Sequence, residues 1–235
     1  VIDWFYVFTH LPWAIRFLRN CTSARAEHIA KSLSAFSCQA GLAYEEIFDD
    51  VDVLNNIVHK EPIFLYESKK LFEQNQYAFN LRKKYDVQFV VINKEDIAKI
   101  EPDLEPIYYN GVVLKGESFT NSPLEITQKI FNNFIKNDGH FIKIKIKSIV
   151  QKDNSLFLKY EKKEQQFDKI VVAAGVWSNM LARTIGDNFP LDTERGYHIV
   201  FENNNNLLTH PVGWAKTGFY MTPMKDGIRV AGTVE

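Results

Sequence analysis

The sequence predicts a mixed α/β fold, with an α/β unit inserted between two halves of a domain built on a largely antiparallel sheet. Residues 122–182 follow the order helix, strand, hairpin, strand and helix, which is typical of an α/β unit. The last third of the chain is rich in short strands and turn residues. Strands predicted at 63–68 and 87–92 can join that part in a single mixed sheet.

The N-terminal part is predicted to be helical from Leu11 to about Val51. Apolar residues recur there at three-to-four spacing, and Thr22 and Ser23 are placed as N-caps, so two helices are the simplest account. After the first strand, Ser68 opens a polar helix that runs to about Tyr85. After the second strand, Asn93 caps a short helix that ends at the following prolines.

The α/β unit begins with a capping box at Ser122–Glu125, which predicts a helix that stops at Asp138–Gly139. Next, Ile142, Ile144 and Ile146 alternate with lysines, which predicts a strand with one buried and one solvated face. A turn at residues 153–154 leads into a second strand.

The stretch Lys169–Met180, KIVVAAGVWSNM, reads as a fully buried strand that ends in Ala-Ala-Gly, followed by a helix from about Ser178. Small residues at the end of a central strand let a ligand lie close against the backbone. Ligands of open α/β sheets collect beyond the carboxyl ends of the strands. The alternative is a core strand whose alanines pack against a helix.

In the last third, strands are predicted at 191–202, 212–215, 219–223 and 228–235. Residues 203–206 are expected to form an exposed loop, and Lys225–Gly227 a hairpin turn.

Composition excludes some classes of partner. The chain has 28 basic and 29 acidic residues, without the basic surplus typical of nucleic-acid binding. Cys21 and Cys38 lie far apart, with no histidine at metal-ligand spacing, so we expect neither a disulfide framework nor a metal site. No apolar stretch is long enough to span a membrane. We expect a cytoplasmic protein. For the apolar stretch Val1–Phe8 there are two interpretations, burial in the fold and peripheral contact with the inner face of the membrane.

Several segments, in order, resemble a known family. They are PWAIRFLRNC, IEPDLEP, KIVVAAGVWS, ERGYHI and GFYMTPMKDGIRVAGTVE. Together they resemble the D-amino acid dehydrogenase and glycine oxidase group of FAD-dependent amine oxidoreductases, which have a D-amino acid oxidase-like fold. The dinucleotide fingerprint G-x-G-x-x-G of that family does not occur in the sequence, nor does its C-terminal glycine-rich segment, so we interpret the chain as a fragment of a longer protein.

The resemblance implies FAD as cofactor and assigns residues to it. Ala174 and Gly175 would lie against the FAD, with Trp177 next to it, and the backbone of Ile146 would meet the adenine side. Plain core packing is the alternative for Ile146.

The resemblance also implies a substrate pocket. Tyr220 would line it and Tyr197 could reach it, and these two are the candidate catalytic-site residues. The alternative for Tyr220 is an aromatic pair with Phe219 or Met221. His198, on the opposite strand face from Tyr197, reads as a hydrogen-bonded structural residue.

A substrate carboxylate calls for a bidentate arginine. Arg195 and Arg229 are available, but the resemblance assigns neither.

The implied reaction is oxidative deamination of a D-amino acid or a related small amine, with electrons passed to a respiratory acceptor. The alternatives are a glycine or sarcosine-type oxidase that reduces oxygen to peroxide, and a non-catalytic interaction domain. The resemblance divides the chain into a substrate domain, 1–117 with 188–235, and part of an FAD-binding domain, 118–187.

Overall fold

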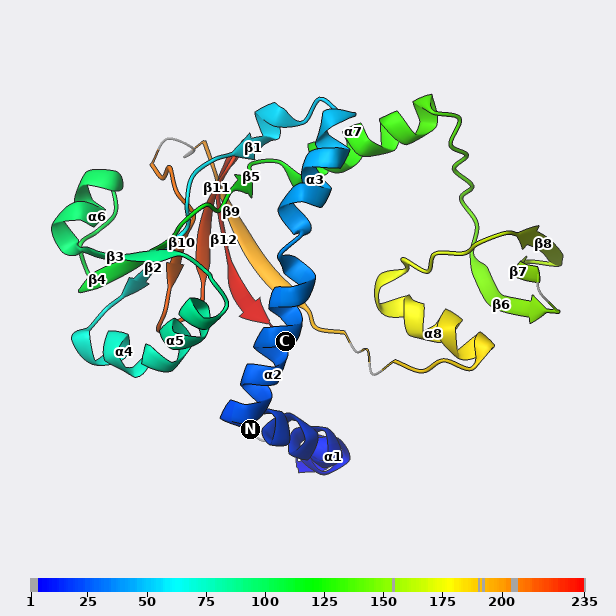
Figure 1. The fold of residues 1–235 in the computed structure, drawn as a ribbon, viewed down its shortest axis with the longest axis horizontal. Coiled ribbons are helices and arrows are strands. Elements are labelled where there is room, and N and C mark those ends of the chain that lie inside the picture. Colours follow the sequence, from blue (N-terminus) through cyan, green and yellow to red (C-terminus); the bar gives the residue numbers. More distant parts are fainter. Residues whose placement is uncertain (1–3, 154, 190, 192, 204–206, 235) are drawn as a thin grey trace. The chain divides into compact units, whose positions relative to one another are not determined.

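The computed structural model describes residues 4–153, 155–189, 191, 193–203 and 207–234. The chain forms two compact units, shown in Figure 1. The first unit is Val1–Asn133 with His198–Thr233, and the second is Phe134–Tyr197 with Val234–Glu235. The predicted domain boundaries at 117/118 and 187/188 assign roles to parts of the chain, and those roles stay predictions.

A seven-stranded mixed sheet forms the framework of the first unit. Its strands in spatial order are β3 (Phe89–Asn93), β4 (Asn110–Leu114), β2 (Ile63–Tyr66), β10 (Val212–Trp214), β11 (Tyr220–Met224), β12 (Gly227–Val234) and β9 (Gly196–Glu202). β2 and β10 are parallel, which joins two antiparallel groups of strands. The predicted single mixed sheet is thereby confirmed, together with the hairpin turn between β11 and β12.

The two faces of this sheet carry different cores, because side chains alternate along each strand. One core holds Ile63, Leu65 and Val212, with Ile97 of α6 (Lys94–Ile100) packed against them. The other holds Tyr66 and Val112, with helices α4 (Lys69–Gln74) and α5 (Gln76–Lys84) contributing apolar side chains. β4, whose residues read NGVVL, is not among the strands predicted from the sequence.

The N-terminal part forms helices α1 (Trp4–Asn20), α2 (Ser23–Ser37) and α3 (Ala40–Asp49), one more than the two that were predicted. The additional break falls at Cys38, the C-cap of α2, and Gln39, the N-cap of α3. The N-cap prediction at Thr22 is confirmed, since its side chain accepts a hydrogen bond from the Arg25 backbone N–H. Of the stretch Val1–Phe8, residues 1–3 lie outside the described residues. In the described part of the chain, no helix combines the length and apolarity needed to cross a bilayer.

Two further N-caps are confirmed. Ser68 Oγ accepts from the Leu71 N–H at 3.2 Å, and Asn93 Oδ1 accepts from the Asp96 N–H at 2.8 Å. The predicted helix up to Tyr85 is interrupted at Asn75, where α4 ends and α5 begins.

Helix α7 (Pro123–Lys136) begins where the capping box predicted, but Ser122 and Glu125 make other hydrogen bonds than the two that a capping box forms between such residues. The Ser122 N–H donates to Thr120 Oγ1. The Glu125 carboxylate accepts from Asn56 Nδ2 and Lys225 Nζ instead. Glu125 therefore joins α7 to η1 (Leu54–Asn56) and to the β11–β12 turn, close to the short pair β1 (Ile57–Val58) and β5 (Phe119–Thr120).

The second unit contains a three-stranded antiparallel sheet of β6 (Ile146–Lys152), β7 (Ser155–Tyr160) and β8 (Lys163–Phe167). The strand predicted from residue 141 begins only at Ile146. The expectation of a buried face is wrong for Ile142 and Ile144, which are exposed. β8 was missed because its sequence KEQQF is almost entirely polar.

The prediction of a buried strand at 169–174 is also wrong. These residues form no strand, and Val171 is 89% exposed. A β-branched run becomes a strand only when another strand pairs with it, and the described residues supply none here. η2 (Gly175–Trp177), α8 (Ser178–Ala182) and η3 (Arg183–Ile185) follow, which confirms the helix expected near Ser178.

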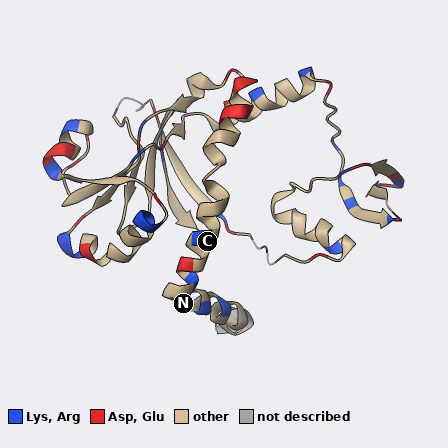
Figure 2. Ribbon diagram, in the orientation of Figure 1, with Lys and Arg blue, Asp and Glu red and all other residues tan. Residues whose placement is uncertain are grey.

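The predicted loop at 203–206 falls mostly outside the described residues. Figure 2 shows the charges of the described chain, with Lys and Arg interspersed among Asp and Glu along helices and strands of both units.

Candidate functional site

Tyr220 lies on the sheet face that also carries Phe64, and its ring reaches across a glycine to meet Phe64. Cross-strand register places Gly213 of β10 between Tyr220 and Phe64. The two rings make an edge contact with centroids 5.8 Å apart and an interplanar angle of 84°. A Cβ at Gly213 would lie 2.8 Å from Tyr220 Cε1, so the ring occupies the space that glycine leaves.

This geometry settles which aromatic residue Tyr220 contacts. Phe219 and Met221 point to the opposite sheet face, where both pack against the core around Trp214. The ring partner of Tyr220 is therefore Phe64: Tyr220 does form an aromatic pair, as the alternative predicted, but not with the predicted partners Phe219 and Met221. Tyr220 remains 46% exposed, which leaves part of its ring open to a ligand.

A cationic and aromatic cluster, which the sequence does not predict, lies beside this ring. The Arg82 guanidinium of α5 lies 5.7 Å from the Phe64 ring centroid and 5.8 Å from that of Phe79. Burial raises the pKa of the Tyr66 phenol, while the neighbouring Arg82 charge opposes that rise. Tyr66 therefore stays a neutral hydroxyl at neutral pH. No sequence signal separated Arg82 from the other basic residues at the end of its helix.

Arg229 shares this sheet face with Tyr220. It lies opposite Thr222, and Ala231 lies opposite Tyr220, so alternation directs Arg229 and Tyr220 to the same side. Arg229 Nε is buried and has no hydrogen-bond partner among the described residues. An unpaired guanidinium N–H is a donor that a carboxylate would satisfy.

Tyr197 and Arg195 interact with each other at the start of β9, where Arg195 Nη1 lies 3.4 Å from the Tyr197 hydroxyl. β12 separates β9 from β11, so Tyr197 and Tyr220 lie on non-adjacent strands of the sheet. His198 is the next residue of β9 and is exposed.

The residues assigned to the cofactor lie in the second unit. Gly175 has φ of +55°, a left-handed conformation that favours glycine, and an added Cβ would meet nothing within 4 Å. Ser178 Oγ accepts from the Ala174 N–H at 3.1 Å, which fixes the turn into α8. Trp177 is 67% exposed. The turn thus presents open backbone at Gly175 and an exposed indole, and the cofactor contacts themselves stay predictions.

Ile146 is the first residue of β6 and pairs with Tyr160 beside a register irregularity. The same strand is tied to η3, since the Thr184 hydroxyl donates to the Ile149 carbonyl and accepts from the Ile149 N–H. Ile146 is half-buried, and its proposed role toward adenine stays a prediction.

Comparison with known proteins agrees with the resemblance seen in the sequence. Residues 22–235 match the family profile DAO, described as FAD dependent oxidoreductase. A protein of Bradyrhizobium diazoefficiens named D-amino-acid oxidase is 30% identical over 236 residues, which cover 100% of this chain and 56% of that protein.

Solved structures show the same fold. Glycine oxidase from Geobacillus kaustophilus superposes with a TM-score of 0.71 at 14% identity, over 92% of this chain and 57% of that one. L-α-glycerophosphate oxidase from Mycoplasma pneumoniae, solved with FAD bound, gives a TM-score of 0.65 at 19% identity, over 77% of this chain and 50% of that one. This chain thus spans little more than half the length of these relatives. Because the family profile matches nearly the whole chain, the protein belongs to the FAD dependent oxidoreductases of the DAO family.

Proposed function

We propose that the complete protein uses FAD to deaminate a D-amino acid oxidatively. Family membership and the relative named D-amino-acid oxidase support this reaction class. The single observation in this chain that carries the proposal is the Tyr220 ring, held over Gly213 against Phe64 with half its surface open.

In this proposal the first unit binds the amino acid. The Tyr220 ring walls the pocket, and its hydroxyl donates to the substrate carboxylate. Arg229, which shares the sheet face of Tyr220, and Arg82 are the candidate cations for that carboxylate. Tyr66, which is only 2% exposed, lies next to Arg82 as a neutral hydroxyl that can hold the guanidinium in place. These groups orient the substrate, which is the main contribution a protein makes to a reaction whose redox chemistry belongs to the cofactor.

The residues proposed to hold FAD are Ala174, Gly175 and Trp177, with Ile146 toward the adenine. When bound, FAD supplies the two-electron oxidant that takes a hydride from the substrate Cα. The resulting imine is then hydrolysed by water to the oxo acid and ammonia. The assignment of 1–117 and 188–235 to a substrate domain, and of 118–187 to an FAD-binding domain, belongs to the same proposal.

Electrons would pass to a respiratory acceptor, which would place the protein in the cytoplasm at the inner face of the membrane. The names of the relatives favour a second candidate, an oxidase of the D-amino acid or glycine type that reduces oxygen to peroxide. Peroxide release during turnover in air would identify the oxidase, and reduction of a quinone analogue without peroxide would identify the dehydrogenase.

The decisive experiment is an anaerobic absorbance spectrum of the protein from the complete gene, recorded before and after addition of D-alanine, D-proline or glycine. We expect a flavin band that bleaches with a D-amino acid. A protein that purifies without flavin and takes none up would overturn the proposal and favour a non-catalytic interaction domain.

Tyr220→Phe tests the pocket. Loss of one hydrogen bond to a charged group, worth about 1.5–3 kcal/mol, should lower kcat/KM by one to two orders of magnitude while flavin stays bound. Tyr109→Phe is the matched control, because Tyr109 is equally exposed at 46%. Equal kcat/KM for Tyr220→Phe and the wild type would remove Tyr220 from the site.

A further inference from the structure

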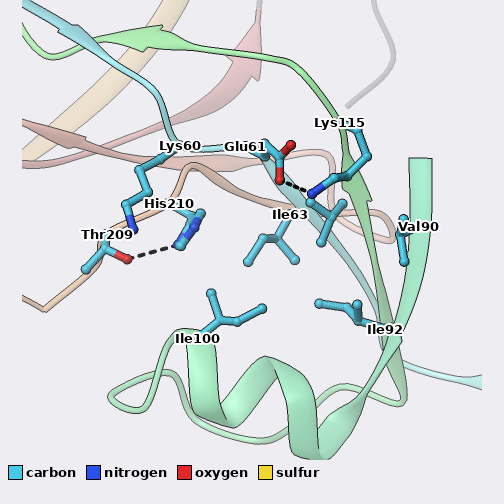
Figure 3. A pocket seen from close by; sticks show the side chains of 10 residues that line it. Lys60, Glu61, Ile63, Val90, Ile92, Ile100, Lys115, Thr209 and His210 are labelled. Carbon is cyan, nitrogen blue, oxygen red and sulfur yellow. Dashed lines mark hydrogen bonds and ion pairs between the residues drawn. The ribbon is translucent and has the colours of Figure 1, made fainter. Parts of the chain in front are cut away.

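A cavity of about 450 Å³ opens on the first unit, on the sheet face opposite to the one that carries Tyr220. Its floor is apolar and comes from adjacent strands and from α6: Ile63 of β2, Ile92 of β3, Val113 of β4 and Ile100. Figure 3 shows Ile92 and Ile100 below the polar residues of the rim. The volume lies in the lower part of the range of about 300–1,000 Å³ typical of small-molecule sites.

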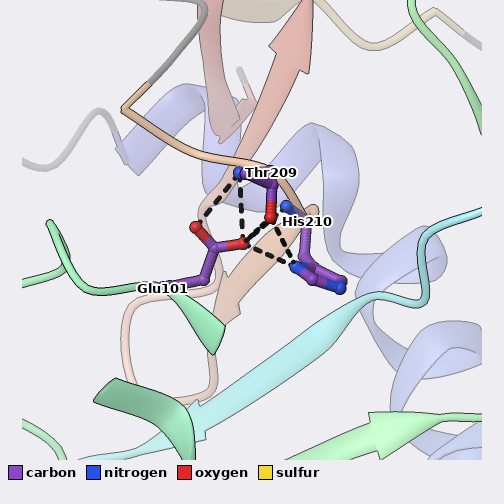
Figure 4. Close-up of polar contacts among 3 residues, drawn as sticks. All are labelled: Glu101, Thr209 and His210. Carbon is purple, nitrogen blue, oxygen red and sulfur yellow. Dashed lines mark hydrogen bonds and ion pairs between the residues drawn. The ribbon is translucent and has the colours of Figure 1, made fainter. Parts of the chain in front are cut away.

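His210 lines this cavity and is fixed from behind by a buried carboxylate. Glu101 is only 1% exposed, and its carboxylate accepts hydrogen bonds from the backbone and side chains of Thr209 and His210 (Figure 4). His210 Nδ1 lies 2.6 Å from Glu101 Oε1. An ionised carboxylate only accepts, so Nδ1 carries the hydrogen. This bond orients the imidazole and leaves Nε2 for the cavity.

The remaining charges of the rim favour an anion. Glu61 is the only acid that lines the cavity in the described chain, and both its oxygens are engaged, one by Lys115 Nζ and the other by the Gly116 N–H. The Lys60 ammonium also lines the cavity and has no side-chain partner among the described residues. Figure 3 shows it on the same side of the cavity as His210 and Thr209. Lys115 thus compensates the negative charge on Glu61, and the Glu101 carboxylate is engaged by Thr209 and His210, so the Lys60 ammonium is the charge of the rim without an ion-pair partner among the described residues.

We propose that this cavity binds a small aliphatic monocarboxylate, whose charged end pairs with Lys60 and His210 and whose hydrocarbon chain lies on the isoleucine and valine floor. The Lys60 ammonium is complementary to one carboxylate, and an imidazole that takes up a proton on Nε2 together with the anion can donate a second hydrogen bond to it. The floor offers no polar group to a second one. This inference goes beyond the flavin reaction and does not depend on it.

The test is isothermal titration calorimetry of the complete protein, at low ionic strength, with butanoate, hexanoate and hexylamine as probes. We expect hexanoate to bind and hexylamine not to bind. Each buried methylene is worth about 0.8 kcal/mol, or about a fourfold change in Kd, so hexanoate should bind roughly fifteenfold tighter than butanoate. The proposal fails if hexanoate does not bind or if hexylamine binds equally well.

Variants locate the binding. Lys60→Met removes the ammonium and keeps the stem, and it should weaken hexanoate binding at least tenfold. His210→Asn keeps a donor near the position of Nδ1 for Glu101 and removes Nε2, so it should weaken binding by a similar factor. Lys94→Met, an exposed lysine of α6 that does not line the cavity, is the matched control and should leave Kd within twofold.

If His210→Asn does not fold, the comparison of Lys60→Met with Lys94→Met still decides the outcome. Lys60→Met is expected to fold, because the Lys60 side chain has no bond to the rest of the described structure. Circular dichroism establishes that each titrated variant is folded. An equal loss in Lys60→Met and Lys94→Met would show a general charge effect and would overturn the proposal. So would full binding by Lys60→Met.

Discussion

Gly213 determines where the Tyr220 ring lies. A methyl group there would approach Tyr220 Cε1 to 2.8 Å and Phe64 Cδ1 to 3.3 Å, so the tyrosine ring has to move. We expect Gly213→Ala to lower the free energy of unfolding by about 1–3 kcal/mol, as overpacking usually does. The displaced ring should also raise KM for the amino acid. Urea unfolding and steady-state kinetics measure the two effects.

Gly196→Ala is the control for this substitution, because an added Cβ at Gly196 meets nothing within 4 Å. It should change neither the unfolding free energy nor KM. If Gly213→Ala raises KM no more than Gly196→Ala does, the Tyr220 ring does not wall the substrate pocket, and its contact with Phe64 is structural.

At the scale of the elements, Glu125 helps to hold α7 in place. Its carboxylate accepts hydrogen bonds from Lys225 of the β11–β12 turn and from Asn56 of η1. The Lys225 hydrogen bond, and then that of Asn56, lower the pKa of Glu125 from its ordinary value of 4.5. The pair also raises the pKa of Lys225. A carboxyl with a lowered folded-state pKa contributes stability that is complete above 4.5 and is lost as pH falls through the lowered value.

Glu125→Gln should therefore lower Tm at pH 7, and the difference from the wild type should shrink as pH falls below 4.5. Thermal unfolding followed by circular dichroism across this range measures it. Glu117→Gln, at an exposed glutamate without a described partner, is the control and should give a small difference that does not vary with pH. A Glu125→Gln difference that persists unchanged in acid would mean that packing of α7, and not the ion pair, holds the helix.

The elements also show which sequence signals were sufficient. N-caps at Thr22, Ser68 and Asn93 were predicted correctly because each depends on a side chain bonding a backbone N–H a few residues away. β8 and residues 169–174 were predicted wrongly for a common reason. A segment becomes a strand only when a partner strand pairs with it. The polar segment β8 pairs with β7, whereas the β-branched residues 169–174 have no partner strand in the described chain.

The candidate site shows the same division between local and tertiary information. Tyr220 was identified from its motif, and the left-handed conformation at Gly175 agrees with the choice of glycine there. The contact of Tyr220 with Phe64 could not be read from the sequence, because it depends on the parallel pairing of β2 with β10. The sequence likewise gave no reason to bring Glu101 to His210, since they meet across more than a hundred residues.

At the scale of the whole molecule, the most conspicuous property is the number of large apolar side chains that the described chain leaves exposed. Trp13, Phe17, Phe36, Val171 and Trp177 are all more than half exposed, and they occur in both units. Apolar patches of this kind mark surfaces that contact other protein or aggregate. The relatives are almost twice as long as this chain, and their additional segments are candidates to cover these surfaces.

We therefore expect the 235-residue chain, expressed by itself, to bind the dye ANS strongly and to sediment as species larger than a monomer. A Trp13→Ser, Phe17→Ser double variant should reduce dye binding, because these two rings stack on the exposed surface of α1 at 5.4 Å. Lys31→Ser, at an exposed lysine of α2, should leave dye binding unchanged. A monomer that binds no dye would contradict the exposed arrangement of these helices and would show that the chain buries their apolar side chains within itself.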